Sequence, residues 1–531
     1  MRDLQNPGRS AVLAPTAMAA TSHPLATQAA IDIMKRGGNA MDAAIGACAV
    51  QCVVEPHMTG IGGDCFALYA PAGAPSPIGY NGSGCAPAGT DAQALRDSGA
   101  TEIAQHSPAA VTIPGAIEAW AQLSADHGKL GLEAVLQAAI GYAENGYPIA
   151  ERTARDWANN ADLLSQSNSA AAVFLPGGKP PKMGDRHAQP ALGATLRAIG
   201  RQGKAAFYEG AAAEEMTAVL QSMGGAHTAD DFANHAGEYV TPISTQYRGR
   251  TVFEIPPNGQ GIIALLMMNA LEHIDLSSYG PLQPERLHAF TEIGRMAYAD
   301  RDAVLADPSV SNVPIAALLS QDRAQAMAAA FDPARAGAVL PSLAGVPHHR
   351  DTIYLCVVDG DGNAVSFINS LFDGFGSGIY APDCGIMLQS RGCGFTLEAG
   401  HMNEIADNKR PMHTIIPGMV YEGGRCTMPF GVMGGHYQAF GHAYVLSNLF
   451  DFDFNVQQAI DLARLFPEPG AALMAERGIP AAAFKALQAK GHVLMPSENP
   501  IGGAQFIQMD HARGCLIGGS DPRKDGCASG Y

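Results

Sequence analysis

The sequence changes character at about residue 351, and this boundary restricts how the chain can fold. Residues 331–351 are rich in Pro, Ala and Gly and have no regular hydrophobic period, which indicates a linker. Directly after it, residues 352–358 and 363–370 form two apolar β-type runs separated by an Asp-Gly-Asp-Gly turn sequence. This pattern predicts a tight β-hairpin. The chain therefore opens a strand at Thr352, immediately after a segment without predicted structure.

The two sides of this boundary have different predicted elements. The part before it is mainly helical, and the part after it is richer in short strands. Before the boundary we expect helices over 23–35 and 40–54 (the second capped by Asn39), a glycine loop over 57–64, strands over 65–69 and 250–255, and helices over 211–223, 262–271 and 286–305. After it we expect further strands over 415–421, 425–428 and 506–508, and helices over 438–449 and 456–465.

Composition favours one large core over several small domains. Only 16% of the 531 residues are charged, against about 25% in typical soluble proteins, and a low charge content fits a large core with little surface. The net charge of −17 argues against nucleic acid and anionic membranes as partners, because both require a basic surface. No apolar run reaches the roughly 18 uninterrupted residues of a membrane span.

The cysteine spacing and the N-terminal residues indicate the cellular compartment in which the protein folds. The ten cysteines include no CxxC pair and no zinc-site spacing, so we expect free thiols in a reducing compartment. Residues 11–20 are short and apolar and resemble a weak signal peptide, but Asp3 and Pro15 argue against one. The expectation is a cytoplasmic protein.

Thr352 is a candidate nucleophile on chemical grounds. A threonine hydroxyl needs a neighbouring base. If the preceding peptide bond is cut, the freed α-amine has a pKa of about 8 and can accept the hydroxyl proton itself. A threonine that merely opens a strand is the simpler alternative.

A glycine pair supplies a second indication. Gly434 and Gly435 follow an apolar strand and precede a helix, where backbone N–H groups can stabilise a developing oxyanion. The alternative is an ordinary strand-to-helix turn.

A series of short motifs runs along nearly the whole chain. They lie at residues 22–26, 37–44, 54–57, 60–63, 113–115, 247–249, 298–301, 357–359, 361–365, 375–378, 409–411, 434–435 and 520–523. Each motif alone is weak, but their shared order is specific. Together they resemble the motifs of the gamma-glutamyltransferase family of N-terminal nucleophile hydrolases.

The resemblance implies the fold and a processing event. It implies an α+β, four-layer αββα sandwich and an inactive precursor that cuts itself before a threonine. Counting back from residues 357–359 places the cut between Asp351 and Thr352. The large chain 1–351 and the small chain 352–531 would share one core as a heterodimer, with further dimerisation left open.

The resemblance also implies roles for single residues. Ser370 occupies the position of a hydroxyl residue that hydrogen-bonds the nucleophile, and Gly434 and Gly435 match the oxyanion-hole glycines. Thr352 is followed by Ile-Tyr where typical transferases have Thr-His, a departure that leaves the nucleophile intact. The mechanism needs no metal and no organic cofactor.

The substrate pocket departs from the family pattern. Where typical transferases have the arginine and aspartate that hold the γ-glutamyl group, this chain has Ser83 and Gly394. A loop asparagine is replaced by Phe372, and two serines are replaced by His413 and Thr414. A pocket without both charges should bind a γ-glutamyl zwitterion poorly, because a buried ion without a partner is costly.

Arg391 stands where typical transferases have a glutamine. We expect it to hold a substrate carboxylate through two N–H groups; an internal salt bridge or a solvent-facing position is the alternative. His413 and His436 flank the expected pocket and either orient the leaving group or are structural. The pair His348-His349 suggests a metal site but fits a linker better.

These features predict an autoprocessing amidohydrolase that cleaves a small amide through a threonyl acyl-enzyme. Three substrates compete: a γ-glutamyl compound such as glutathione, an oxamate-type amide and a glutaryl-type amide. Hydrolysis is preferred over transfer, because nothing marks an acceptor site. The rival from another class is an uncleaved, inactive homologue that only binds. A nucleotide-binding role is excluded, because residues 374–378 lack the GxGxxG spacing.

Overall fold

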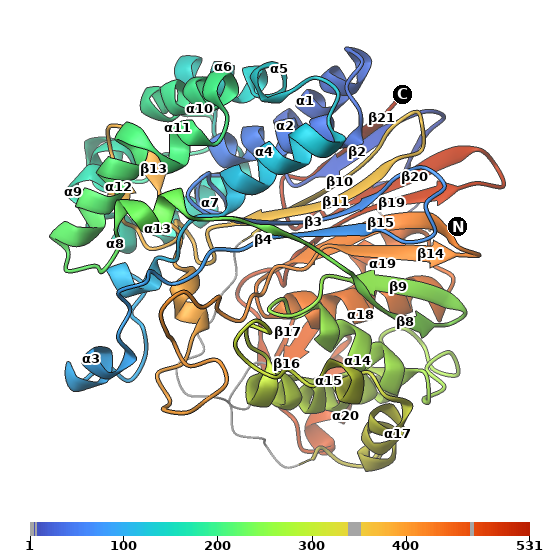
Figure 1. The fold of residues 1–531 in the computed structure, drawn as a ribbon. Coiled ribbons are helices and arrows are strands. Elements are labelled where there is room, and N and C mark those ends of the chain that lie inside the picture. Colours follow the sequence, from blue (N-terminus) through green and yellow to red (C-terminus); the bar gives the residue numbers. More distant parts are fainter. Residues whose placement is uncertain (1–4, 6–7, 338–351, 468–471) are drawn as a thin grey trace.

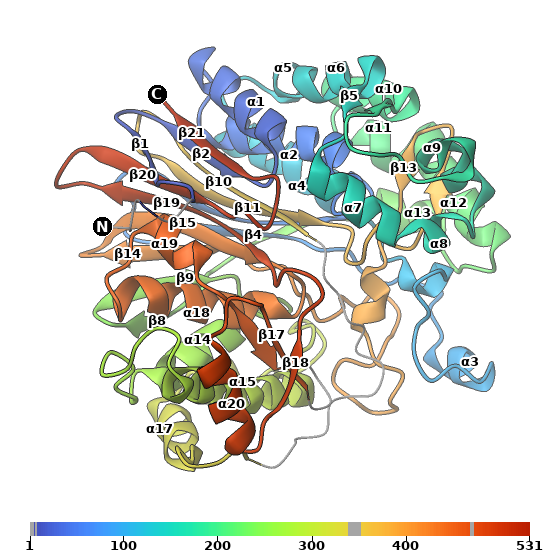
Figure 2. The same ribbon diagram turned by 180° about the vertical axis from the view of Figure 1, so that it is seen from behind.

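The computed structural model describes residue 5 and residues 8–337, 352–467 and 472–531. Asp351, the pair His348-His349 and most of the predicted linker therefore lie outside the described residues. In the described part, two antiparallel seven-stranded sheets stack face to face between two layers of helices (Figure 1, Figure 2). The predicted αββα sandwich is confirmed.

Each sheet contains strands from both sides of residue 351. The first sheet has the order β1 (Val12–Ala14), β20 (Cys515–Ser520), β19 (Gly503–Asp510), β15 (Arg425–Met433), β14 (Gly418–Glu422), β9 (Arg250–Glu254) and β8 (Ile243–Tyr247). The second has the order β21 (Cys527–Gly530), β2 (Met18–Thr21), β10 (Ile353–Val358), β11 (Ala364–Ser370), β3 (Asp64–Ala70), β4 (Ile78–Gly82) and β7 (Glu238–Val240). Neither half of the chain can form these sheets alone, which agrees with a single shared core.

Helices cover the outer face of each sheet. Over the second sheet lie α1 (Pro24–Lys35), α2 (Ala40–Val54) and α4 (Ala116–His127), with α5 (Leu132–Val135), α6 (Gln137–Asn145) and α10 (Pro190–Gln202) beyond them. Over the first sheet lie α14 (Gly261–Leu271), α18 (Tyr437–Phe450) and α19 (Val456–Asp461), followed by α15 (Pro284–Val304), α17 (Gln321–Ala330) and α20 (Ala481–Ala489).

Shorter elements extend the sandwich at its margins. The helices are α3 (Ala92–Asp97), α7 (Glu151–Asn159), α8 (Ala161–Leu164), α9 (Asn168–Phe174), α11 (Ala205–Tyr208), α12 (Gly210–Ser222), α13 (Ala229–Ala233) and α16 (Ile315–Leu318). The strands are β5 (Tyr147–Pro148) with β6 (Arg186–His187), β12 (Tyr380–Ala381) with β13 (Ile386–Met387), and a small sheet of β16 (Leu465–Pro467), β17 (Ala472–Ala475) and β18 (Val493–Pro496).

Local sequence signals place the predicted helices well. Asn39 caps α2 as expected, because its side chain accepts the Asp42 N–H while the Asp42 carboxylate accepts the Asn39 N–H. All fifteen residues of α2 are buried, so this helix is apolar on every side. No helix in the described part of the chain is long and apolar enough to cross a membrane.

Several predicted boundaries are wrong. The strand expected over 415–421 begins only at Gly418, and the strand expected over 506–508 extends over Gly503–Asp510. The strand expected over 425–428 continues to Met433, because Pro429 lies where β15 pairs with β14 only, before pairing with β19 begins at Phe430. The helix expected over 456–465 ends at Asp461, since Leu462 has an extended ψ of 139° and Leu465 starts β16. Residues 11–20 contribute β1 and β2, and all ten cysteines, each in the described part, are free thiols.

Candidate active site

Thr352 and Ser370 lie side by side at one end of the second sheet. In the β10–β11 pair Ile353 opposes Asn369, so Thr352 faces Ser370, the last residue of β11. The two hydroxyl oxygens are 3.1 Å apart. Ser370 Oγ also accepts the Phe372 N–H at 2.9 Å, so the Ser370 proton can be donated to Thr352 Oγ1. Thr352 is 0% exposed.

The glycine loop 57–64 shapes this end of the sheet. A Cβ atom on Gly63 would lie 2.2 Å from the carbonyl oxygen of Ser370, so only glycine permits the close approach. The loop leads into β3, whose first residue, Asp64, pairs with Ser370 in the sheet. Asp64, Ser370 and Thr352 therefore occupy neighbouring strands at one edge.

The glycine pair lies at the same end of the first sheet. β15 ends at Met433, Gly434 has a φ of +123°, Gly435 has a φ of +56°, and α18 begins at Tyr437. Ser366 Oγ donates to the Phe430 carbonyl at 3.2 Å across the two sheets. Gln260 links this turn to Ser370, because its side chain donates to the Gly435 carbonyl and its N–H donates to the carbonyl of His413, whose ring contacts Asp64 beside Ser370. The structure thus brings the predicted nucleophile and glycine pair to a common edge.

Hydrogen bonds from Gln260 hold the glycine turn in place. Its side-chain amide donates to the carbonyl oxygens of Thr414 at 2.8 Å and Gly435 at 2.9 Å. Its Oε1 in turn accepts Nη1 of Arg301 at 3.2 Å. Because the Gln260 side chain donates to the carbonyl oxygens of both Thr414 and Gly435, it fixes the orientation of these two peptide groups.

Arg301 and Tyr298 on α15 hold His436. Arg301 Nη1 lies 2.9 Å from His436 Nδ1, and the Tyr298 hydroxyl donates to the His436 carbonyl oxygen. A guanidinium only donates, so His436 Nδ1 accepts and its ring proton is on Nε2. His436 is thus fixed in orientation and in tautomer. The sequence showed Tyr298 and Arg301 only as a family motif without a role.

His413 is tied to the buried carboxylate of Asp64. His413 Nε2 lies 3.0 Å from Asp64 Oδ2. Oδ1 accepts the N–H groups of Gly84 and Gly115 and the side-chain amide of Gln389. Burial raises the pKa of Asp64, but the hydrogen bond and charge of His413 and the charge of Arg391 outweigh it, so the net pKa is lowered. Asp64 is ionised and fixes His413 at the edge of the site.

Arg391 is fully buried, and two of its three guanidinium nitrogens make no hydrogen bond among the described residues. It begins a short 3₁₀ helix, is 0% exposed, and its guanidinium lies 4.2 Å from the centre of the Phe372 ring. Nη1 donates to Thr414 Oγ1 at 2.9 Å. Nε and Nη2 have no acceptor among the described residues. These two atoms form one side of the guanidinium, the side that grips a carboxylate through two parallel hydrogen bonds.

The charge state of Arg391 follows from its surroundings. Burial lowers its pKa, while the nearby carboxylates of Asp64 and Asp373 raise it. A guanidinium still keeps its proton at neutral pH. An internal salt bridge is not formed among the described residues, and the side chain does not face solvent. Leaving each buried donor unpaired costs about 1–3 kcal/mol, so the arrangement suits an anionic ligand.

Neutral groups occupy the positions that are charged in typical transferases. Ser83 donates to Asn81 Oδ1 at 2.7 Å and accepts from Asn258 at 3.2 Å. A Cβ atom on Gly394 would lie 2.8 Å from the Met412 carbonyl oxygen. The backbone therefore leaves little room for an acidic side chain at Gly394. The difference from typical transferases at this position follows from the local packing.

Known proteins resemble this chain over nearly its whole length. The family model for gamma-glutamyltranspeptidase matches residues 26–531. The chain is 36% identical to the glutathione hydrolase-like YwrD proenzyme of Bacillus subtilis, over 97% of this chain and 98% of that protein. It is 32% identical to the oxamate amidohydrolase proenzyme of Klebsiella pneumoniae, over 97% and 98%. The crystal structure of cephalosporin acylase from Bacillus halodurans superposes with a TM-score of 0.93 at 37% identity, over 100% and 99%.

Proposed function

Because the chain belongs to the gamma-glutamyltranspeptidase family of N-terminal nucleophile hydrolases, we propose that it cuts itself between Asp351 and Thr352 and then hydrolyses a small carboxylate-bearing amide. The observation that carries the proposal is that Arg391, whose Nε and Nη2 have no acceptor among the described residues, packs on Phe372, and the Phe372 N–H donates to the same Ser370 hydroxyl that contacts Thr352. Thr352 and Ser370 supply the nucleophile, and Arg391 selects the substrate.

Cleavage converts Thr352 into a complete nucleophile. The new α-amine accepts the proton of Oγ1, directly or through one water molecule, and Oγ1 attacks the amide carbonyl. Ser370 donates a hydrogen bond to Oγ1 and so holds it in place before the attack. The α-amine has a pKa of about 8, so a useful fraction is neutral at physiological pH.

The acyl-enzyme forms and breaks down at the glycine turn. The N–H groups of Gly434 and Gly435 stabilise the oxyanion, a contribution of about 100- to 1,000-fold in rate for one donor. The leaving amine takes the proton from the α-amine, and water then releases the acid. His436 and His413 are held by Arg301 and Asp64, which favours a role in shaping the pocket over proton transfer.

Arg391 selects the substrate class. Nε and Nη2 fit a carboxylate side-on, and Thr414 supports the guanidinium from Nη1. The group that would hold the ammonium of a γ-glutamyl substrate is absent at Gly394. An oxamate-type or glutaryl-type amide, with one carboxylate and no ammonium, therefore fits better than glutathione. The oxamate amidohydrolase among the similar proteins supports the oxamate-type choice.

The two products of cleavage, 1–351 and 352–531, remain one molecule. β10 pairs with β2, β11 pairs with β3, and β14 pairs with β9, so each sheet is shared between the products. Separation would expose both sheets, and we expect a stable heterodimer.

An amide panel tests the proposal. Oxamate, a glutaryl amide and a γ-glutamyl amide are offered to the wild type and to Thr352→Ala, and the wild type is run on a denaturing gel. We expect two bands, a small chain beginning Thr-Ile-Tyr-Leu, and turnover of the first two substrates only. A single full-length band without turnover would instead support the inactive binding homologue.

A further inference from the structure

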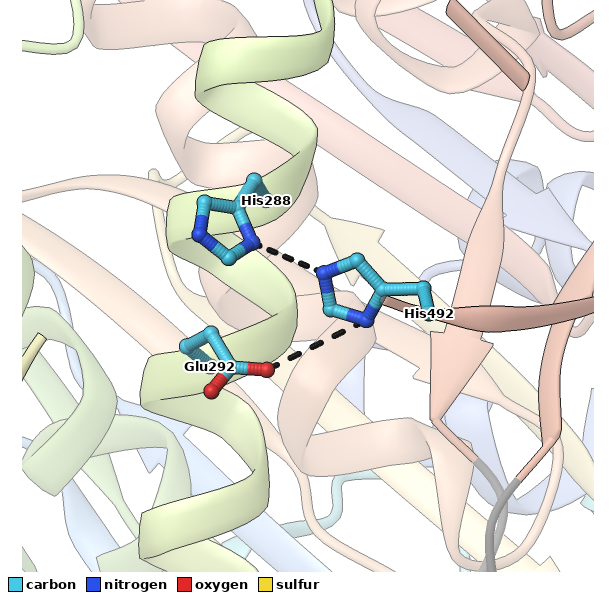
Figure 3. A group of neighbouring side chains, drawn as sticks. All are labelled: His288, Glu292 and His492. Carbon is cyan, nitrogen blue, oxygen red and sulfur yellow. Dashed lines mark hydrogen bonds and ion pairs between the residues drawn. The ribbon is translucent and has the colours of Figure 1, made fainter. Parts of the chain in front are cut away.

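Three buried side chains converge outside the active site, at the junction of α15 and the small sheet. His288 and Glu292 lie one turn apart on α15, and His492 immediately precedes β18 (Figure 3). Each offers a metal-ligating atom, and these atoms lie within 4.8 Å of one another. The residues are 0%, 9% and 8% exposed. None of them contributes to the chemistry proposed for Thr352.

The protons of this cluster can be placed from its hydrogen bonds. His288 Nε2 lies 2.9 Å from the carbonyl oxygen of Asp332, which only accepts, so Nε2 carries the proton and Nδ1 presents a lone pair. His288 Nδ1 is 2.7 Å from His492 Nε2, so His492 donates there. That leaves a lone pair on His492 Nδ1 facing Glu292 Oε1 at 3.9 Å. In this tautomer the His492 lone pair points away from His288, so the two rings face one ion only after the His492 proton moves from Nε2 to Nδ1.

We propose that His288, Glu292 and His492 bind one divalent transition-metal ion, with zinc as the preferred ion. Two imidazoles and one carboxylate are the ligand types that zinc takes, whereas calcium and magnesium prefer oxygen ligands alone. The ion replaces the proton between the rings. That proton moves to His492 Nδ1, so the ring stays neutral and binds the ion through Nε2.

The surroundings of the cluster already orient its ligands. The His288 ring is held by the Asp332 carbonyl, an arrangement common for metal-bound histidines. Glu292 Oε2 accepts the Gly337 N–H at 2.7 Å, and Oε1 accepts Arg295 Nη1 at 3.0 Å. The positive charges of Arg295 and Lys490 repel a metal cation bound at His492. We therefore expect a moderate affinity for the metal.

Binding requires only a small rearrangement. Two nitrogen ligands of a tetrahedral zinc lie about 3.3 Å apart, since each bond is about 2.0–2.1 Å long. The nitrogens His288 Nδ1 and His492 Nε2 are closer than this, at 2.7 Å, and a small rotation of the His492 side chain separates them. The ion would join α15, β18 and residues 332–337, three segments distant in sequence, which indicates a structural role.

The test uses the purified enzyme stripped with a chelator and then titrated with Zn²⁺. Bound metal is measured by elemental analysis and calorimetry, and Co²⁺ is used as a spectroscopic substitute. We expect one equivalent per chain and a Co²⁺ spectrum of tetrahedral nitrogen and oxygen ligation. His492→Asn should weaken binding more than about 100-fold, because loss of an outer partner alone costs about 10- to 100-fold. His273→Ala, at an exposed position, is the matched control.

Three results would overturn the site. One is a wild type that binds well below one equivalent at saturating Zn²⁺. Another is His492→Asn binding Zn²⁺ as the wild type does. The third is a Co²⁺ spectrum showing thiolate ligation. If His492→Asn fails to fold, Glu292→Gln removes the carboxylate and should give the same loss, with folding checked by circular dichroism.

Discussion

The Nη1 group of Arg391 donates a hydrogen bond to Thr414 Oγ1 at 2.9 Å, while Nε and Nη2 of Arg391 are buried without an acceptor in the described part of the chain. A buried guanidinium in this state lowers stability unless a ligand completes it. The unused side of the guanidinium is therefore the clearest indication of what the pocket binds.

Arg391→Met should separate binding from stability. We expect KM for oxamate-type amides to rise about 100-fold, since a two-point charge-assisted contact is worth about 2–3 kcal/mol. KM for a neutral amide should change less than about threefold. The melting temperature should stay level or rise, because two unpaired buried donors disappear. Equal effects on both amides would contradict carboxylate binding, and Arg425→Met, at an exposed position, serves as the control.

Thr352→Ala should leave a folded, full-length, inactive chain. The side chain lost is the proposed nucleophile for both cleavage and turnover, while the β10–β11 pairing does not depend on it. Thr352→Ser should retain slower cleavage, because it keeps a hydroxyl. A denaturing gel and N-terminal sequencing check both. Cleavage of Thr352→Ala at the same bond would rule out Thr352, and Thr427→Ala on β15 controls for loss of a strand threonine.

Ser370→Ala should slow both steps without abolishing them. The change removes the 3.1 Å contact with Thr352 and the acceptor of the Phe372 N–H. Loss of about 1–1.5 kcal/mol corresponds to roughly tenfold in rate. We expect this loss in kcat, measured with the preferred amide, and little change in KM. An unchanged kcat would show that Ser370 does not position the nucleophile.

Gln260→Glu tests whether the glycine turn is held by donated hydrogen bonds. The substitution keeps the shape but replaces the donor to the Thr414 and Gly435 carbonyls by an acceptor. We expect kcat to fall about 10- to 100-fold, because misplaced oxyanion donors lose much of their effect. The exposed Gln246→Glu controls for added charge. Wild-type kcat in Gln260→Glu would mean that the turn needs no such support.

His187 should make the protein less stable in acid. Burial among aromatic rings lowers its pKa from 6.5 to about 4, so the unfolded chain binds this proton more tightly than the folded one. Stability from this group is complete above pH 6.5 and falls by about 1.4 kcal/mol per pH unit on the way to about pH 4. Urea unfolding at pH 7, 6 and 5 measures the slope.

His187→Leu should make that slope shallower by about the same amount. The exposed His273→Leu should leave it unchanged. A wild-type slope retained in His187→Leu would assign acid sensitivity to other groups.

Local patterns predicted the elements that depend on near neighbours. The hairpin from Ile353 to Ser370, the Asn39 cap of α2 and the glycine turn at Gly434 are all confirmed as structures. Each depends on hydrogen bonds or dihedral angles within a few residues, so its signal is present in a short stretch of sequence.

Elements that depend on distant partners were missed or misplaced. β1 and β2 are too short to be recognised in an apolar segment that also fits a weak signal peptide, and they exist because β20 and β10 pair with them. β16 exists because β17 pairs beside it. Strand length in such cases is decided by the neighbour, which no local pattern contains.

By itself, the sequence determined the family, the sandwich, and the candidate nucleophile Thr352 with its glycine pair, because these are carried by ordered motifs and local turns. Only the tertiary structure decided that Arg391 has two donor atoms without an acceptor among the described residues, that Gln260 and Arg301 hold the glycine turn, and that His492 meets His288. These relationships join residues separated by up to about two hundred positions. Their energies come from burial and exact distances, which exist only after the chain has closed its core.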